Sequence, residues 1–147
     1  MSPSVACLDT SVLVKLLVAE EGSEVAHELA ERLYSAGRPI IAPAWTWAEV
    51  GSVLLKKARS GDIGEAELAQ AWDTYRAYPV LYLDSAELRE TAWALVAQFA
   101  LPTLYDATFL ACVQLVAPDD GEFWTADRAL LRSLGKARPA YVRELGA

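Results

Sequence analysis

The sequence predicts an α/β protein in which helices cover both faces of a parallel sheet. Short apolar runs typical of buried strands alternate with longer segments of helical periodicity, and short polar turns join them. The chain has 147 residues, the size of one domain, and contains no linker, internal repeat or low-complexity tract. We therefore expect residues 1–147 to form a single domain.

Apolar runs place four strands at residues 5–8, 40–42, 80–83 and 122–125, and a fifth at 138–142. Apolar residues at three- and four-residue spacing predict helices at residues 12–18, 20–36, 44–60, 65–78, 104–117 and 127–134. A further helix, capped by Asp84 and Ser85, runs to about residue 99. The spacing places Trp47 in the core, and Pro118-Asp119-Asp120-Gly121 reads as a turn.

Composition excludes several classes of protein. Cys7 and Cys112 lie in apolar stretches without metal-site spacing, so we expect reduced core thiols rather than a disulfide or zinc site. The single histidine, His27, lies among glutamates on a charged helix, which excludes histidine chemistry. The chain has neither an apolar run long enough to span a bilayer nor a basic segment that would begin a secretory signal, so we expect a cytoplasmic protein.

Four carboxylates are candidates for one site. Asp9 directly follows the first predicted strand, and Asp127 follows the fourth. Asp106 begins the helix that leads into the fourth strand, and Glu49 lies one turn into the helix after the second. Sites in open parallel sheets form beyond the carboxyl ends of the strands, so all four could face one crevice.

Each aspartate alone also fits a structural role, because aspartate is a favoured helix cap. Glu49 is different, since an unpaired carboxylate in this apolar segment would be costly and calls for a cation. Mg²⁺ and Mn²⁺ bind oxygen ligands and can activate water against a phosphate. The formal charge of −7 argues against broad adhesion to nucleic acid, unless bound cations reverse the sign of the local field.

Four segments together resemble the PIN-domain family, in particular its VapC-type toxin branch. They are Leu8-Asp9-Thr10-Ser11, Ala48-Glu49-Val50, Leu104-Tyr105-Asp106-Ala107 and Thr125-Ala126-Asp127-Arg128 with the residues that follow each, in the family's order. The resemblance implies a three-layer α/β/α fold with strand order 3-2-1-4-5. It also implies an endoribonuclease that uses Mg²⁺ or Mn²⁺, cuts RNA, is restrained by a small antitoxin and forms a homodimer.

By position, the resemblance makes Asp9 and Asp106 the main metal ligands and Asp127 a further ligand, direct or through water. Glu49 would hold metal or orient the attacking water. Hydroxyls of Thr125, Thr10 and Ser11 would orient these carboxylates. Some relatives carry another acid just after the last motif; here the residues are Arg128, Ala129 and Leu130, which puts a second metal site in doubt.

Two other functions stay open from the sequence. A phosphoacceptor signalling domain would use Asp84 as the phosphorylated residue, assisted by Thr125 and Lys136, but it leaves Glu49 unexplained. A catalytically silent domain with the same fold, acting only as a binding module, would preserve the pattern without the chemistry.

Overall fold

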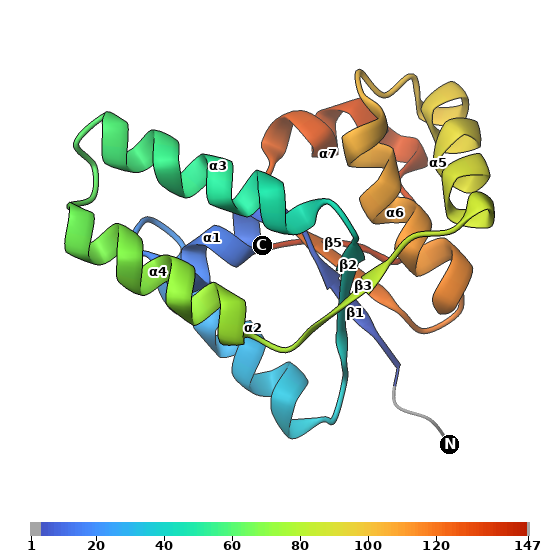
Figure 1. The fold of residues 1–147 in the computed structure, drawn as a ribbon. Coiled ribbons are helices and arrows are strands. Elements are labelled where there is room, and N and C mark those ends of the chain that lie inside the picture. The colour runs from blue at the N-terminus through green and yellow to red at the C-terminus, as the bar shows by residue number, and fades with distance from the viewer. Residues whose placement is uncertain (1–3, 147) are drawn as a thin grey trace.

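The computed structural model describes residues 4–146 and has three layers, with a parallel sheet between two layers of helices (Figure 1). The strand order is β3-β2-β1-β4-β5, which confirms the predicted order. The strands are β1 (Ala6–Leu8), β2 (Ile40–Pro43), β3 (Val80–Leu83), β4 (Glu122–Thr125) and β5 (Val142–Glu144). The helices are α1 (Thr10–Leu17), α2 (Ser23–Ser35), α3 (Thr46–Arg59), α4 (Glu65–Ala77), α5 (Ala86–Phe99), α6 (Leu104–Val116) and α7 (Arg128–Leu134).

The central strand β1 divides the core into two parts. Successive side chains of a strand point to opposite faces. Ala6 and Leu8 accordingly pack with buried residues of α1 to α4, whereas Cys7 packs with those of α5, α6 and α7. All three are fully buried, because β1 has a strand on each side and helices above and below. This position explains why β1 is apolar throughout rather than alternating.

The fifth strand lies further along the chain than predicted. The sequence places it at residues 138–142, but β5 is Val142–Glu144 and pairs with β4. A 3₁₀ turn, Gly135–Ala137, follows α7, and the Val142 N–H donates to the carbonyl of Pro139 at 3.1 Å. Pro139 has no N–H for a sheet, so the chain turns there and becomes extended only afterwards.

The start of α5 also differs from the prediction. Ser85 alone caps this helix, because its hydroxyl accepts the Leu88 N–H at 3.0 Å. Asp84 instead binds the exposed side chain of Arg89 through two hydrogen bonds of 3.0 and 2.8 Å. The side chain of Asp84 therefore pairs with a neighbouring guanidinium rather than with the end of the helix.

A close approach at Gly121 sets α6 against β4. The Gly121 N–H donates to the carbonyl of Ala117 at 2.8 Å, and a Cβ at residue 121 would lie only 2.7 Å from that oxygen. The predicted turn at residues 118–121 is thus confirmed, and it reverses the chain. The start of α6, with Asp106, consequently lies at the same end of the molecule as the close of β4.

No single helix in residues 4–146 is long and apolar enough to cross a membrane. The helices α5 and α6 reach the length and apolar content of a membrane span only when they are taken together, and a bend of 114° separates them.

Candidate active site

The neighbouring strands β1 and β4 bring Asp9 and Asp127 to the same edge of the sheet. The strands pair with Leu8 opposite Trp124, and the Asp9 N–H donates to the carbonyl of Trp124 at 3.2 Å. Asp9 follows β1 directly, and Asp127 lies two residues beyond the end of β4. The parallel pairing thus produces the juxtaposition on which the prediction for Asp127 depended.

Both carboxylate oxygens of Asp9 accept hydrogen bonds. The side chain is buried, and its Oδ1 accepts from the Ser11 hydroxyl and from the Val12 N–H at 3.2 Å. Its Oδ2 accepts from the hydroxyl of Thr125, which is also fully buried. The bond to Val12 caps α1, so a capping role and a role in the site coexist in this residue.

Two of the predicted orienting hydroxyls connect α1 to the turn between β4 and α7. Ser11 Oγ accepts the Ala126 N–H at 3.0 Å, and Thr125 Oγ1 accepts the Asp127 N–H at 2.9 Å. Each hydroxyl therefore donates to Asp9 and accepts from the backbone beside Asp127. This arrangement fixes the rotamer of Asp9 and couples it to the position of the second acid.

Burial raises the pKa of Asp9 to about 6. The hydroxyls of Ser11 and Thr125 and the Val12 N–H oppose this rise because they stabilise the charged form, while the negative charge of Asp127 adds to it. At neutral pH Asp9 is thus a buried anion that hydrogen bonds compensate only partly.

Asp106 joins this group from α6. It lies in the first turn of the helix, half-buried, and the cap is the Thr103 hydroxyl, which accepts the Asp106 N–H at 3.5 Å. Burial raises the pKa of Asp106, and the charges of Asp127 and Glu49 raise it further. The Asp106 carboxylate is therefore within electrostatic range of both, and it is not needed to cap its own helix.

Asp127 combines two tasks, as Asp9 does. Its Oδ1 accepts the N–H groups of Ala129 and Leu130 at 2.9 and 3.1 Å and so caps α7. In residues 4–146 its other oxygen, Oδ2, accepts no hydrogen bond. The cap holds the carboxylate in place while one oxygen remains available at the edge of the sheet.

Glu49 is less buried than its sequence context suggests. The expectation of an enclosed carboxylate is wrong, because Glu49 is partly exposed and its neighbours Trp47 and Ala48 are exposed. The buried face of α3 is formed by Thr46, Val50 and Leu54 instead. Glu49 Oε1 accepts the hydroxyl of Thr10, as the predicted orienting role for Thr10 requires.

The four acids fit a hard divalent cation by their chemistry. Among residues 4–146, no lysine, arginine or histidine forms an ion pair with any of them. In the same range, no three acidic, histidine or cysteine side chains are grouped closely enough to enclose a metal ion. Mg²⁺ needs no such cage, because it commonly binds one or two carboxylates and keeps several waters. The oxygen donors therefore suit an open Mg²⁺ or Mn²⁺ site.

Sequence reasoning missed two threonines at this edge. Thr103 could have been found, because a threonine three residues before Asp106 is a common capping pattern. Thr46 is one turn before Glu49, fully buried, and its hydroxyl has no partner in the described part of the chain. Nothing in its sequence context indicates that it is buried.

Asp84 lies away from the four acids. It follows the edge strand β3, and both β2 and β1 separate that strand from β4, which carries Thr125. Thr125 is bonded to Asp9 instead. The grouping of Asp84 with Thr125 that a phosphoacceptor domain would require is therefore wrong.

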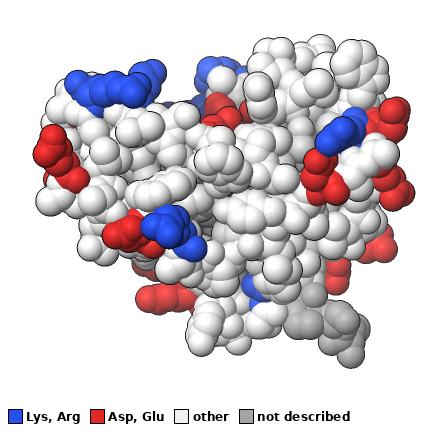
Figure 2. Space-filling view, in the orientation of Figure 1, with Lys and Arg blue, Asp and Glu red and all other residues white. Residues whose placement is uncertain are grey.

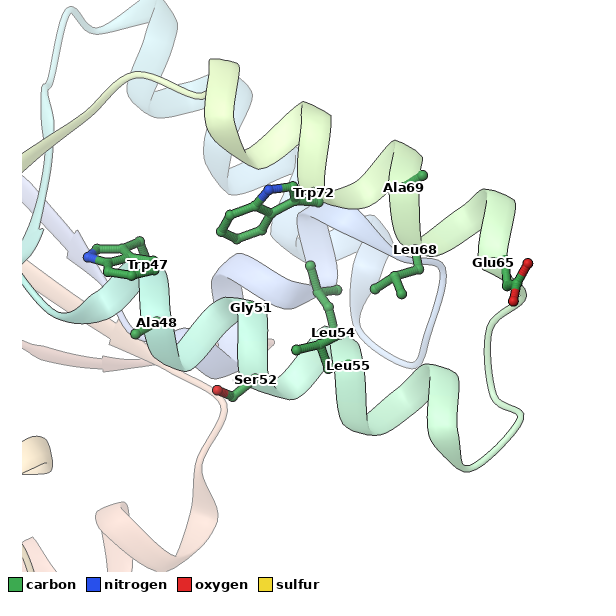
Figure 3. A pocket seen from close by; sticks show the side chains of 10 residues that line it. All are labelled: Trp47, Ala48, Gly51, Ser52, Leu54, Leu55, Glu65, Leu68, Ala69 and Trp72. Carbon is green, nitrogen blue, oxygen red and sulfur yellow. The ribbon is translucent and has the colours of Figure 1, made fainter.

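An apolar groove lies between α3 and α4, and its lining includes Trp47 and Ala48, which directly precede Glu49 in the chain (Figure 3). Its volume is about 550 Å³, and Trp47 and Trp72 face it from the two helices. Trp47 is 54% exposed, so the prediction that it belongs to the core is wrong. Trp45, by contrast, packs edge-on against Tyr105 and Phe109.

Comparison with known proteins agrees with this architecture. The family model of the PIN domain matches residues 6–132. The crystal structure of PAE2754 from Pyrobaculum aerophilum is similar over 97% of this chain and 90% of that one, with a TM-score of 0.61 and 21% identity. Among curated proteins, none matches this sequence. The structural likeness supports the fold, and the family match covers all four acids.

Proposed function

Because this chain belongs to the PIN domain family, whose members are typically nucleases, we propose that it is a Mg²⁺- or Mn²⁺-dependent endoribonuclease that hydrolyses phosphodiester bonds in RNA. One observation carries the proposal: the buried carboxylate of Asp9 lies beside other acids without a basic partner in residues 4–146. A cluster of this kind is unfavourable unless a cation binds it.

In this proposal Asp9 and Asp106 hold the cation, and Asp127 adds a ligand directly or through water. A bound divalent ion would polarise the scissile phosphate and lower the pKa of the attacking water. Ser11 and Thr125 keep Asp9 in one rotamer, so the carboxylate need not reorganise when a cation binds. The cap of α7 does the same for Asp127.

Glu49 is suited to a separate task because water can reach it. Its Oε1 accepts the hydroxyl of Thr10, which orients the carboxylate at the rim. The second oxygen can then accept a hydrogen bond from a water and remove its proton as it attacks phosphorus. Glu49 would thus orient the attacking water or add a metal ligand.

We further propose that the protein is the toxin of a toxin–antitoxin pair and acts as a homodimer. The apolar groove between α3 and α4 supports a protein partner, because such exposed surfaces commonly mark interaction sites. An antitoxin helix seated there would contact Trp47 and Ala48, next to Glu49 in the chain of α3, and could restrict access to the acids.

Cleavage of labelled single-stranded RNA with Mg²⁺ or Mn²⁺ tests the nuclease proposal. We expect Asp9→Asn and Asp106→Asn each to lower kcat/KM by about a hundredfold or more, since each removes a charged ligand. Asp84→Asn is the matched control, because it neutralises a carboxylate remote from the acids. Equal cleavage by wild type and all three variants would contradict the proposal.

The toxin role needs a different experiment. Expression of wild type without a partner should arrest growth, and expression of Asp9→Asn should not. When a small neighbouring gene is expressed together with either form, its product should co-purify with it. Normal growth with active nuclease in the cell would reject the toxin role and leave the nuclease proposal intact.

A further inference from the structure

A second cavity borders the turn between β4 and α7, which carries Asp127, and it contains basic side chains. Its volume is about 320 Å³, and its lining includes Lys15 from α1, Arg128 from α7, Gly22 and Ala126. Ala126 lies between Thr125 and Asp127 in the chain, and its N–H donates to Ser11. Ala126 therefore connects the cavity lining to Ser11, which donates to Asp9, and to its chain neighbour Asp127.

Lys15 is held at this cavity by its surroundings. A Cβ at residue 22 would lie 3.1 Å from Lys15 Cε and 3.2 Å from Cδ, so the glycine leaves room for the lysine stem. Its ammonium lies 3.5 Å from Glu20, whereas Lys57 binds the same carboxylate at 2.7 Å. Lys57 is thus the nearer partner of Glu20, and the ammonium of Lys15 is held more loosely.

Arg128 is in an unusual position for a cation. It is the first residue of α7, where the helix dipole disfavours positive charge. Its side chain is exposed and makes no ion pair with another residue of 4–146. Figure 2 shows a small group of basic and acidic atoms side by side near the top of this face. The helix dipole thus gives Arg128 no favourable interaction with its own helix.

The lining also limits what can bind. Glu21 and Glu144 belong to the same cavity, and they would repel a second phosphate. A single phosphodiester between Lys15 and Arg128 fits this distribution, because its one negative charge meets two cations. Because the overall charge of −7 opposes the approach of nucleic acid, a strand would depend on local cations such as this pair.

We propose that Lys15 and Arg128 bind one backbone phosphate of the RNA strand, next to the phosphate that is cut, and thereby position the substrate at the acids. This inference rests on the proposed nuclease function. Both are positioning residues, because neither touches the reacting atoms.

Binding of a fluorescein-labelled single-stranded RNA, measured by anisotropy with Ca²⁺ in place of Mg²⁺, tests the proposal. We expect Lys15→Gln and Arg128→Gln each to raise Kd about fivefold at 0.1 M salt and to reduce the slope of log K against log salt by about 0.7. In cleavage assays the same variants should raise KM more than they lower kcat.

Two matched controls remove a cation outside the cavity. Lys56→Gln and Arg59→Gln each neutralise an exposed side chain in the last turn of α3. Neither should change the salt slope. Because Arg128 is exposed, its variant should keep the wild-type melting temperature even if Lys15→Gln is less stable.

Two results would overturn the proposal. In the first, Lys15→Gln and Arg128→Gln both bind RNA with the Kd of the wild type and with the same slope of log K against log salt. The nuclease proposal would still stand in that case if the wild type cleaves RNA. The other is a wild type that does not bind RNA at all. Binding with the expected shifts but without cleavage in Mg²⁺ or Mn²⁺ would instead reject the nuclease proposal and retain the phosphate site.

Discussion

Replacing Asp9 by asparagine should stabilise the metal-free protein near neutral pH, although it removes a central side chain of the site. Burial raises the pKa of Asp9 from 3.8 to about 6, so ionisation of this residue costs the folded state free energy. The difference corresponds to about 3 kcal/mol above pH 6. Asparagine has nearly the same shape and no charge, and it therefore avoids this cost.

The loss of the hydrogen bond from Thr125 reduces the stabilisation expected for Asp9→Asn. The Thr125 hydroxyl donates to Asp9 Oδ2, which becomes an amide nitrogen if Oδ1 keeps its bonds to Ser11 and Val12. Such a mismatch costs about 1 kcal/mol. We expect a net stabilisation of about 2 kcal/mol, or roughly 4 to 8 °C in melting temperature for a chain of this size.

The stability difference between Asp9→Asn and the wild type should depend on pH, and this dependence shows whether ionisation of Asp9 causes it. Because the folded pKa of Asp9 is raised, its favourable contribution is complete below about pH 4 and is lost as the pH rises through 6. The variant lacks this loss, so its advantage should disappear towards pH 4. Urea unfolding in EDTA from pH 4 to pH 7.5 measures the difference. A variant that is less stable than wild type by the same amount at every pH would refute the reasoning.

Asp106→Asn should also stabilise the metal-free protein relative to the wild type as the pH rises, because the pKa of Asp106 is raised. Thermal unfolding in EDTA measures this difference, and a variant that melts below the wild type at pH 7.5 would contradict the expectation. Thr125→Val should lower the free energy of unfolding by about 1–3 kcal/mol, because it leaves the Asp127 N–H unpaired. The same change should raise the pKa of Asp9, and carboxyl NMR titration would detect a failure to do so. Asp84→Asn should leave both melting temperature and RNA cleavage unchanged, because its pair with Arg89 is solvent-exposed; reduced cleavage would count against a site at β1 and β4.

The fold was predictable where one physical signal dominated. The residues of β1 are all apolar because helices cover both faces of the sheet there. The end of this apolar run marks the end of the strand and so places Asp9 directly after it. The fifth strand was misplaced because the turn at Pro139 depends on a local hydrogen bond that apolar content does not indicate. Trp47 was assigned to the core because helical spacing does not reveal which face of α3 meets the sheet.

For the site, sequence order identified the acids but not the connections between them. Ser11 and Ala126 are far apart in the chain, and only the pairing of β1 with β4 brings them into contact. The exposure of Glu49 depends on the orientation of α3, so its apolar neighbours misled the prediction. The space that Gly22 leaves for Lys15 is likewise a tertiary contact without a sequence pattern.

Anomalous scattering from a crystal soaked in Mn²⁺ would show whether Asp9 and Asp106 bind a cation, because it locates the ion without an assay of activity. We expect a peak at the end of β1 and β4, against the carboxylates of Asp9 and Asp106, that is absent from the Asp9→Asn variant. A fully soaked crystal with no peak there, or with the same peak in the variant, would contradict the assignment of these acids to a metal site.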